Sequence, residues 1–144
     1  MARLLPPLVL DTHVWIWVMD GARGELDADV LEAVEEASSR GRVLVSAISV
    51  WEVAMLAAKG RVRFSMPVEE WVRRALAAPG VRLAELSPAV AIDSVGLPGY
   101  EHGDPADRML MATARSHGAM LVTCDSRILE YAHGGHVAAL DARP

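Results

Sequence analysis

Residues 8–17 read LVLDTHVWIW, and the fold can be worked out from this stretch. The three apolar residues at 8–10 predict a buried strand that ends at Asp11. Thr12 follows, where its hydroxyl would cap a helix that carries Trp15 and Trp17. A short apolar strand that runs directly into a helix is the repeating unit of an α/β protein.

The rest of the chain continues this alternation of short apolar runs and longer helical patterns. We expect further strands at residues 43–45, 120–123 and 137–140, and a short one that includes Val81, Leu83 and, in one reading, Leu86. No internal repeat or linker divides the chain. The sequence therefore predicts an α/β fold with a central, mainly parallel sheet of four to five strands, formed by residues 1–144 as one domain.

Composition supports an ordinary folded domain. The chain has 144 residues, of which 52% are apolar and 23% charged, so it can bury a core of its own. Its single cysteine, Cys124, cannot form an internal disulfide. The apolar stretch LLPPLVL at residues 4–10 is too short to span a bilayer and is broken by two prolines. We expect no signal peptide, no membrane span and a cytoplasmic location.

The formal net charge of −5 argues against a protein that binds nucleic acid by broad electrostatic attraction. That objection weakens if the acids gather at a site for divalent cations, because bound metals reverse the field that a phosphate meets. Net charge alone therefore leaves nucleic-acid chemistry open.

Four acids stand where such a site would form. Asp11 and Asp125 lie just past strands, and Glu52 and Asp107 lie early in helices that follow a strand or a loop. In a parallel sheet, the carboxyl ends of the strands and the starts of the next helices share one edge, where ligands bind. We expect the four carboxylates to meet there.

Such a cluster needs protons or cations. Two carboxylates about 4 to 5 Å apart repel by roughly 3 to 4 kcal/mol at an effective dielectric constant of about 20. Hard, all-oxygen ligands favour Mg²⁺ or Mn²⁺ over zinc. One or two such ions would hold a phosphate and activate a water, so the chemistry predicted is phosphodiester hydrolysis.

Each acid also has a purely structural interpretation. Asp11 could serve simply to start a helix, Glu52 could pair with an arginine, and Asp125 could be a turn residue. Asp104 and Asp107 could serve their helix as N-cap and first-turn acid; we favour that interpretation for Asp104 and the site for Asp107.

Other residues are weaker candidates. His133 and His136 lie in a glycine-rich HGGH turn with no third ligand, and Cys124 reads as a small strand residue. The tryptophans are expected in the core. Arg108 and Arg127 directly follow site segments, where they could bind phosphates or pair with the acids.

Several motifs together resemble a known family. The segments LDTHVWIW, VSAISVWEVA, GDPADRMLMATA and LVTCDSRI occur in the order and spacing of a PIN-domain toxin of the VapC family, over residues 8–140. The resemblance implies a three-layer α/β/α PIN fold and a metal-dependent ribonuclease of a toxin–antitoxin pair. The family's acids correspond to Asp11, Glu52, Asp107 and Asp125, with Thr123 nearby.

The resemblance further implies a homodimer, a small VapB-like antitoxin as inhibitor and a structured cellular RNA as substrate. Arg108, Thr123 and Arg127 are the residues that we expect beside the RNA. The magnesium or manganese ion would be held by the four acids.

Two other functions fit parts of the pattern. A haloacid-dehalogenase-like phosphatase would use Asp11, Ser46, Lys59 and the GDPAD acids in that order. The pattern of such enzymes at the first strand is DxD, with a second acid two residues after the first, but this chain has His13 at that position. Glu52 would then have no role. A non-catalytic metal-binding module that sequesters a partner is the other alternative.

Overall fold

The computed structural model describes residues 5–144. Its strands are β1 (Leu8–Leu10), β2 (Val43–Ser46), β3 (Val81–Ala84), β4 (Met120–Thr123) and β5 (Ala138–Asp141). Its α-helices are α1 (Thr12–Asp20), α2 (Ala28–Ser39), α3 (Ala47–Ala58), α4 (Val68–Leu76), α5 (Pro88–Val95), α6 (Pro105–Ser116) and α7 (Ser126–Ala132), with a short 3-10 helix at Arg23–Glu25. None of these helices has both the length and the apolar character needed to cross a bilayer.

The five strands form one sheet in the order β3-β2-β1-β4-β5, and every neighbouring pair is parallel. The predicted α/β class is therefore confirmed. The predicted strands lie where the sequence places them to within one residue, and the third strand ends at Ala84, before Leu86.

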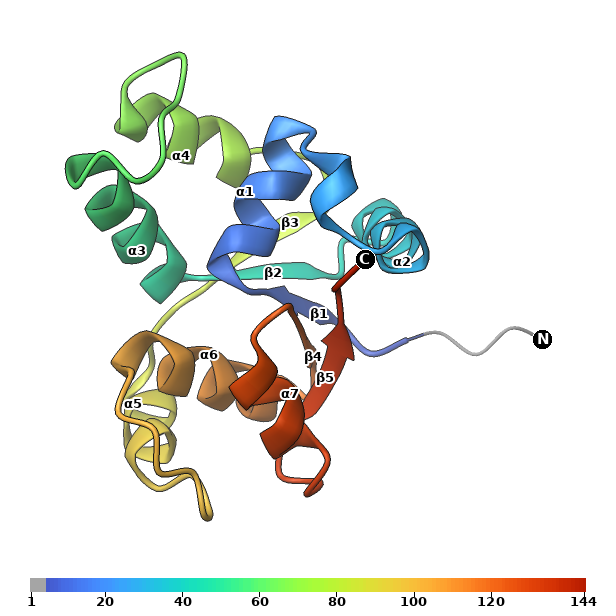
Figure 1. The fold of residues 1–144 in the computed structure, drawn as a ribbon, viewed down its shortest axis with the longest axis vertical. Helices are drawn as coiled ribbons and strands as arrows, with labels where there is room; N and C mark the ends of the chain where they lie inside the picture. Colours follow the sequence, from blue (N-terminus) through green and yellow to red (C-terminus); the bar gives the residue numbers. More distant parts are fainter. Residues whose placement is uncertain (1–4) are drawn as a thin grey trace.

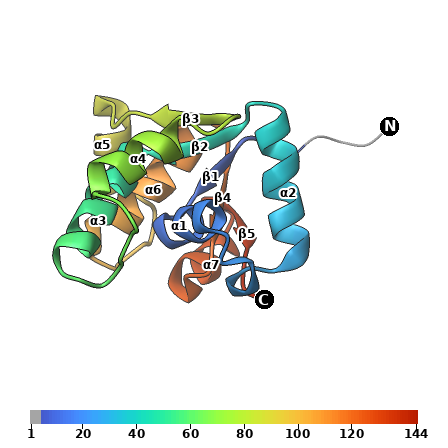
Figure 2. The ribbon, with the colours of Figure 1, turned by 90° about the horizontal axis from the view of Figure 1, so that it is seen from above.

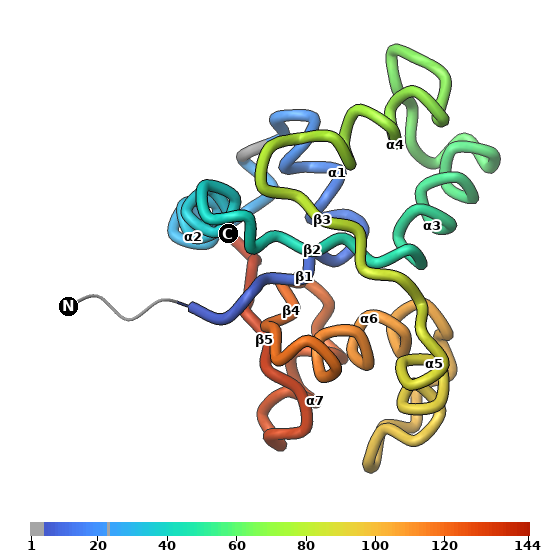
Figure 3. The backbone as a smooth tube through the Cα atoms, turned by 180° about the vertical axis from the view of Figure 1, so that it is seen from behind, coloured from blue at the N-terminus to red at the C-terminus, as the bar shows by residue number. Residues whose placement is uncertain are grey.

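Side chains alternate between the two faces of the sheet and create two cores. Leu8 and Leu10 of β1 pack on one face, with residues of α1, α2, α3 and α4. Val9, between them, packs on the other face with α6, α7 and the connection between α5 and α6. Figure 1 shows the sheet between these two groups of helices, so the fold has three layers, and Figure 3 shows the same layers from behind.

Acidic or hydroxyl side chains begin the helices that follow β1, β2 and β4. Asp11 caps α1, Ser46 caps α3 and Asp125 caps α7, each by accepting a backbone N–H of its own helix. The cap of α1 is a correction: the sequence predicts Thr12 as the cap, but Thr12 is the first helical residue and donates its N–H to Asp11. The side chain of Thr12 is therefore available for another contact.

Strands β1 and β4 form the point at which the strand order reverses. From β1 the chain passes to β2 on one side, whereas β4 lies on the other side of β1 and pairs in register with it. Helices α1 and α7 leave these two strands on opposite faces of the sheet, above and below it in Figure 1; Figure 2 looks down on this arrangement from the α1 side. Such a switch point leaves a crevice at the carboxyl ends of the strands, where α/β proteins bind their ligands.

Candidate metal-dependent active site

Two of the predicted acids are joined across the switch point by a threonine. The Thr123 hydroxyl donates a hydrogen bond to Asp11 Oδ2 (2.6 Å) and accepts one from the backbone N–H of Asp125 (3.0 Å). Thr123 is fully buried, and Asp11 Oδ1 accepts the N–H of Thr12 (2.7 Å). The fold therefore places Asp11 and Asp125 at the neighbouring ends of β1 and β4.

Glu52 reaches the same place from the second turn of α3. The buried Thr12 hydroxyl lies between Glu52 Oε1 (2.5 Å) and Ser49 Oγ (2.9 Å). Because Thr12 directly follows Asp11, this contact brings the Glu52 carboxylate next to that of Asp11. The negative charge of Asp11 in turn raises the pKa of Glu52, after the larger effect of burial.

Asp107 lies in the first turn of α6, behind the cap of that helix. Asp104 Oδ1 accepts the N–H groups of Ala106 (2.9 Å) and Asp107 (3.1 Å), so the structure shows Asp104 as the helix cap. In the part of the chain described, the Asp107 carboxylate itself accepts no hydrogen bond. Burial first, and then the charges of four other acids, raise its pKa to about 7; these acids are Asp104, Asp11, Asp125 and Glu52.

The four predicted acids influence one another electrostatically. Burial also raises the pKa of Asp11 and of Glu52, although the Thr123 and Thr12 hydroxyls act in the opposite direction. Asp125 adds to the repulsion at Asp11. Removing a proton from Asp11, Glu52 or Asp107 therefore costs more than it would on an isolated surface carboxyl.

Among the side chains that the structure describes, no basic residue forms an ion pair with this group. The ion pairs that the structure describes include Glu36, Glu70, Asp93 and Asp141, and none of these involves the four acids. The structural alternative for Glu52, a pair with an arginine, is therefore not seen among the described residues; the partner of Glu52 is Thr12. Buried carboxylates without a cation are typical of metal sites and of proton-sharing sites.

The donor set fits a hard divalent cation. All four side chains offer carboxylate oxygens, the ligands that Mg²⁺ and Mn²⁺ prefer. Their present arrangement is open: within residues 5–144, no three His, Cys, Asp or Glu side chains surround a common point closely enough to hold an ion. Because like charges repel, bringing these carboxylates closer together needs a cation between them.

The two arginines predicted beside the substrate have different surroundings. The Arg108 guanidinium donates to the carbonyls of Tyr100 (2.6 Å), His102 (2.7 Å) and Ser94 (3.2 Å), so it holds the connection between α5 and α6. Arg127 is exposed at the start of α7, and its side chain has no hydrogen-bond or ion-pair partner among the residues described. Of the two, Arg127 is the one free to meet a phosphate.

The weaker candidates remain outside this group. The exposed His133 and His136 lie at the end of α7, and His136 stacks on Tyr131. Cys124 is half-buried, and burial raises the pKa of its thiol. The expectation that all tryptophans are core residues is wrong for Trp51, which is 56% exposed directly before Glu52.

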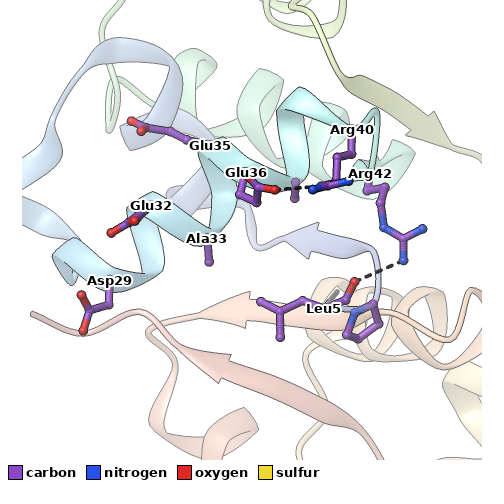
Figure 4. A pocket seen from close by; sticks show the side chains of 10 residues that line it. Leu5, Asp29, Glu32, Ala33, Glu35, Glu36, Arg40 and Arg42 are labelled. Atoms are coloured by element: carbon purple, nitrogen blue, oxygen red, sulfur yellow. Dashed lines mark hydrogen bonds and ion pairs between the residues drawn. The ribbon is translucent and has the colours of Figure 1, made fainter. Parts of the chain in front are cut away.

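A cavity lies near the start of β1, at the end of the strand opposite to Asp11. The cavity, of about 650 Å³, separates α2 from the residues that precede β1, and Figure 4 shows the acidic side chains of α2 along one side of it. Arg42 donates to the Leu5 carbonyl (3.2 Å) at its rim, and Arg40 pairs with Glu36. Since β1 starts there and ends at Asp11, this cavity is separate from the group of four acids.

The geometry disfavours the phosphatase alternative. The Ser46 hydroxyl caps α3 by accepting the N–H of Ile48. Lys59 follows the last residue of the same helix, roughly 18 Å away for 12 helical residues. These two side chains therefore cannot act on one phosphate.

Sequence reasoning misses three residues that shape the site. The sequence presents Thr12 only as a cap, and it does not point to Ser49 or Tyr100 at all. Thr12 and Ser49 carry a usable signal, because each is a hydroxyl residue within three positions of a predicted site acid. Tyr100 carries none, since it lies in a non-repetitive segment between two helices.

Known proteins resemble this chain in sequence. The PIN domain family model matches residues 8–134. Ribonuclease VapC22 of Mycobacterium tuberculosis is 37% identical over 126 residues, which are 88% of this chain and 92% of that protein.

Solved structures share the fold. A chain in the crystal structure of VapBC2 from Rickettsia felis, bound to a DNA fragment from their promoter, superposes with a TM-score of 0.67 at 12% identity, over 94% of this chain and 98% of that one. A chain of DNA-bound VapBC from Salmonella typhimurium gives a TM-score of 0.63 at 18% identity, over 95% and 98%.

Proposed function

This chain belongs to the PIN-domain family, as a VapC-type ribonuclease of a toxin–antitoxin system, and we propose that Asp11, Glu52, Asp107 and Asp125 are its metal ligands and catalytic acids. One observation carries the proposal. At the ends of β1 and β4 the Thr123 hydroxyl donates to Asp11 and the Thr12 hydroxyl donates to Glu52, the charges of the other acids raise the pKa of Asp107, and none of the four has a basic partner among the side chains described.

The metal is Mg²⁺ or Mn²⁺ in this proposal. When bound, it supplies charge for the phosphate and lowers the pKa of an attacking water. The chain's own contribution is to hold the acids in place: Thr123 fixes Asp11 beside Asp125, and Thr12 fixes Glu52. Asp107, whose carboxylate accepts no hydrogen bond from the residues described, has both oxygens available as ligands.

RNA is the proposed substrate. The exposed Arg127 at the start of α7 is the residue that we assign to its phosphate backbone. For Thr123 and Arg108 we propose positioning roles, because the first is buried between two acids and the second is bound to three carbonyls. Few phosphate contacts imply that binding depends on the metal more than on broad basic charge.

The proposed assembly is a homodimer neutralised by a VapB-like antitoxin. Large exposed apolar side chains gather between residues 83 and 95, where Ile92 and Val95 of α5 are 74% and 81% exposed. Ile92 and Val95 are three residues apart and so share one face of α5, and an exposed apolar face of this kind marks a contact surface. We assign this face to a second copy of the chain, with the whole of 1–144 acting as one PIN domain.

The proposal is tested by incubating the purified protein with total cellular RNA, with and without Mg²⁺ or Mn²⁺. An Asp11→Asn variant and a generic phosphomonoester substrate are run in parallel. We expect RNA cuts that require metal and that disappear in the variant, without phosphomonoester turnover.

Two results would contradict it. Phosphomonoester turnover without RNA cleavage would indicate a phosphatase. Silence on both substrates, in a preparation that still shows a metal-induced rise in melting temperature, would indicate a non-catalytic metal-binding module.

A further inference from the structure

Tyr100 is a buried side chain with an unsatisfied hydroxyl. It lies in the connection between α5 and α6 and is only 6% exposed. Its Oη has no hydrogen-bond partner; among the residues described, Trp15 Nε1 is the one other buried side-chain polar atom in this state. A buried polar group without a partner is costly, so such a group needs an explanation, for example a ligand.

Tyr100 packs between α6 and α7, because Arg108 of α6 and Tyr131 of α7 both contact its ring. Burial, and then the charges of Asp107 and Asp125, raise the pKa of Tyr100 to about 12. Arg108 of α6 and Arg127 of α7 act in the opposite direction. The phenol therefore keeps its proton at neutral pH and remains a hydrogen-bond donor.

The surrounding side chains hold this donor in a fixed position. The Arg108 guanidinium lies over the Tyr100 ring at 5.2 Å and donates to the Tyr100 carbonyl at 2.6 Å. The rings of Tyr131 (5.0 Å) and His102 (5.2 Å) contact the same ring edge-on. These contacts restrict the position of the ring, and therefore the directions in which its hydroxyl can donate.

The chemistry of the site decides which ligand suits a donor. The four acids offer acceptors, and the hydroxyl protons of Thr12 and Thr123 are already given to Glu52 and Asp11. A water molecule bound to a cation would be a hydrogen-bond donor, so the carboxylates could accept from it. A non-bridging phosphate oxygen has only lone pairs, so it needs a donor of the kind that Tyr100 provides.

We propose that the Tyr100 hydroxyl donates a hydrogen bond to a non-bridging phosphate oxygen of the bound RNA. Tyr100 is thus a substrate-binding residue, and Arg108 is the residue that positions it. This inference rests on the proposed function, because it assumes that a phosphodiester enters the group of four acids.

The test compares Tyr100→Phe with Tyr131→Phe. Both variants lose only a hydroxyl from the same aromatic cluster, but the Tyr131 hydroxyl already donates to the Pro98 carbonyl (2.7 Å). We expect Tyr100→Phe to lower kcat/KM by about 10-fold on an oligoribonucleotide that the wild-type protein cuts, the loss typical of one hydrogen bond to a charged group. Tyr131→Phe should change kcat/KM by less than about twofold, because its hydroxyl is bound to the fold.

Two further measurements separate binding of phosphate from a structural role. The melting temperature of Tyr100→Phe should equal or exceed that of the wild type, because an unsatisfied buried hydroxyl is removed. Its Mn²⁺ affinity without RNA, measured by calorimetry, should stay close to the wild-type value. An RNA with sulfur in place of one non-bridging oxygen at the cut site should lose its sensitivity to Tyr100→Phe in one of the two stereoisomers.

The outcomes are distinct. Unchanged kcat/KM in Tyr100→Phe, with normal RNA cleavage by the wild type, would overturn the role of Tyr100 and leave the proposed function standing. A matching fall in Mn²⁺ affinity would assign the hydroxyl to the metal and not to the phosphate, which also overturns it. Absence of metal-dependent RNA cleavage by the wild type would overturn both proposals.

Discussion

Thr123 donates its hydroxyl proton to Asp11 Oδ2 across 2.6 Å. This bond joins the ends of two neighbouring strands, β4 and β1, and fixes the orientation of the Asp11 carboxylate. Residues that orient a metal ligand commonly contribute about 10- to 100-fold to metal affinity. We therefore expect Thr123→Val to weaken Mn²⁺ binding by that factor in calorimetry, whereas Thr123→Ser should restore it. Equal affinities for the valine variant and the wild type would contradict this.

Glu52 can be changed without removing its contact to the fold. In Glu52→Gln the amide oxygen can still accept from the Thr12 hydroxyl, but the negative charge is lost. We expect the melting temperature without metal to stay close to that of the wild type, and the rise produced by millimolar Mn²⁺ to disappear. Glu36→Gln, which changes an exposed acid paired with Arg40, is the matched control and should keep the full rise.

Stability of the metal-free protein should fall as pH rises. The pKa of Asp107 is raised from 3.8 to about 7, so in that range the folded state holds a proton that the unfolded chain has released. Each increase in pH between these values therefore favours unfolding, and the contribution is lost above about pH 7. Thermal unfolding in a chelator, from about pH 5 to about pH 8, should show a falling melting temperature. A steady rise over this interval would refute the assignment.

Removing the charge of Asp107 should separate stability from function. At about pH 8, Asp107→Asn relieves repulsion from the neighbouring acids, so the metal-free melting temperature should rise by roughly 2 to 5 °C, equivalent to about 1 kcal/mol. At about pH 5 the gain should be smaller, because the wild-type carboxyl is already protonated. RNA cleavage should be lost at both values. A variant that is destabilised at the higher pH would show that Asp107 supports the fold instead.

The exposed face of α5 gives a prediction about assembly. Ile92→Glu combined with Val95→Glu should shift the protein from dimer to monomer in sedimentation velocity, because charges would be buried between two copies. Leu5→Glu, which changes another exposed apolar residue before β1, is the control and should leave the dimer intact. Identical sedimentation of all three proteins would place the contact elsewhere.

Much of the site follows from the sequence because parallel strands end at a common edge. Asp11 and Asp125 can be placed there from the apolar runs alone, and Asp104 can be assigned as a cap from the proline that follows it. The assignment of Asp107 to the site stays a prediction, supported by the effect of the other acids' charges on its pKa.

Other features depend on contacts between distant segments, which periodicity does not encode. The sequence suggests that Arg108 binds phosphate or an acid, but it holds the Tyr100 segment through three carbonyls, a contact formed by the folded connection itself. The apolar pattern of α3 predicts Trp51 in the core, although it lies on the open side of the helix. The strand order, and with it the switch point, likewise follows from pairing across the chain.

The central claim is that the four acids bind a divalent metal, and anomalous X-ray scattering from a crystal soaked in Mn²⁺ tests it most directly. We predict a peak about 2 Å from carboxylate oxygens of the group at the ends of β1 and β4, with Asp11 among the ligands. Absence of a peak there at millimolar Mn²⁺, or a peak confined to another place such as the turn at His133 and His136, would contradict the account.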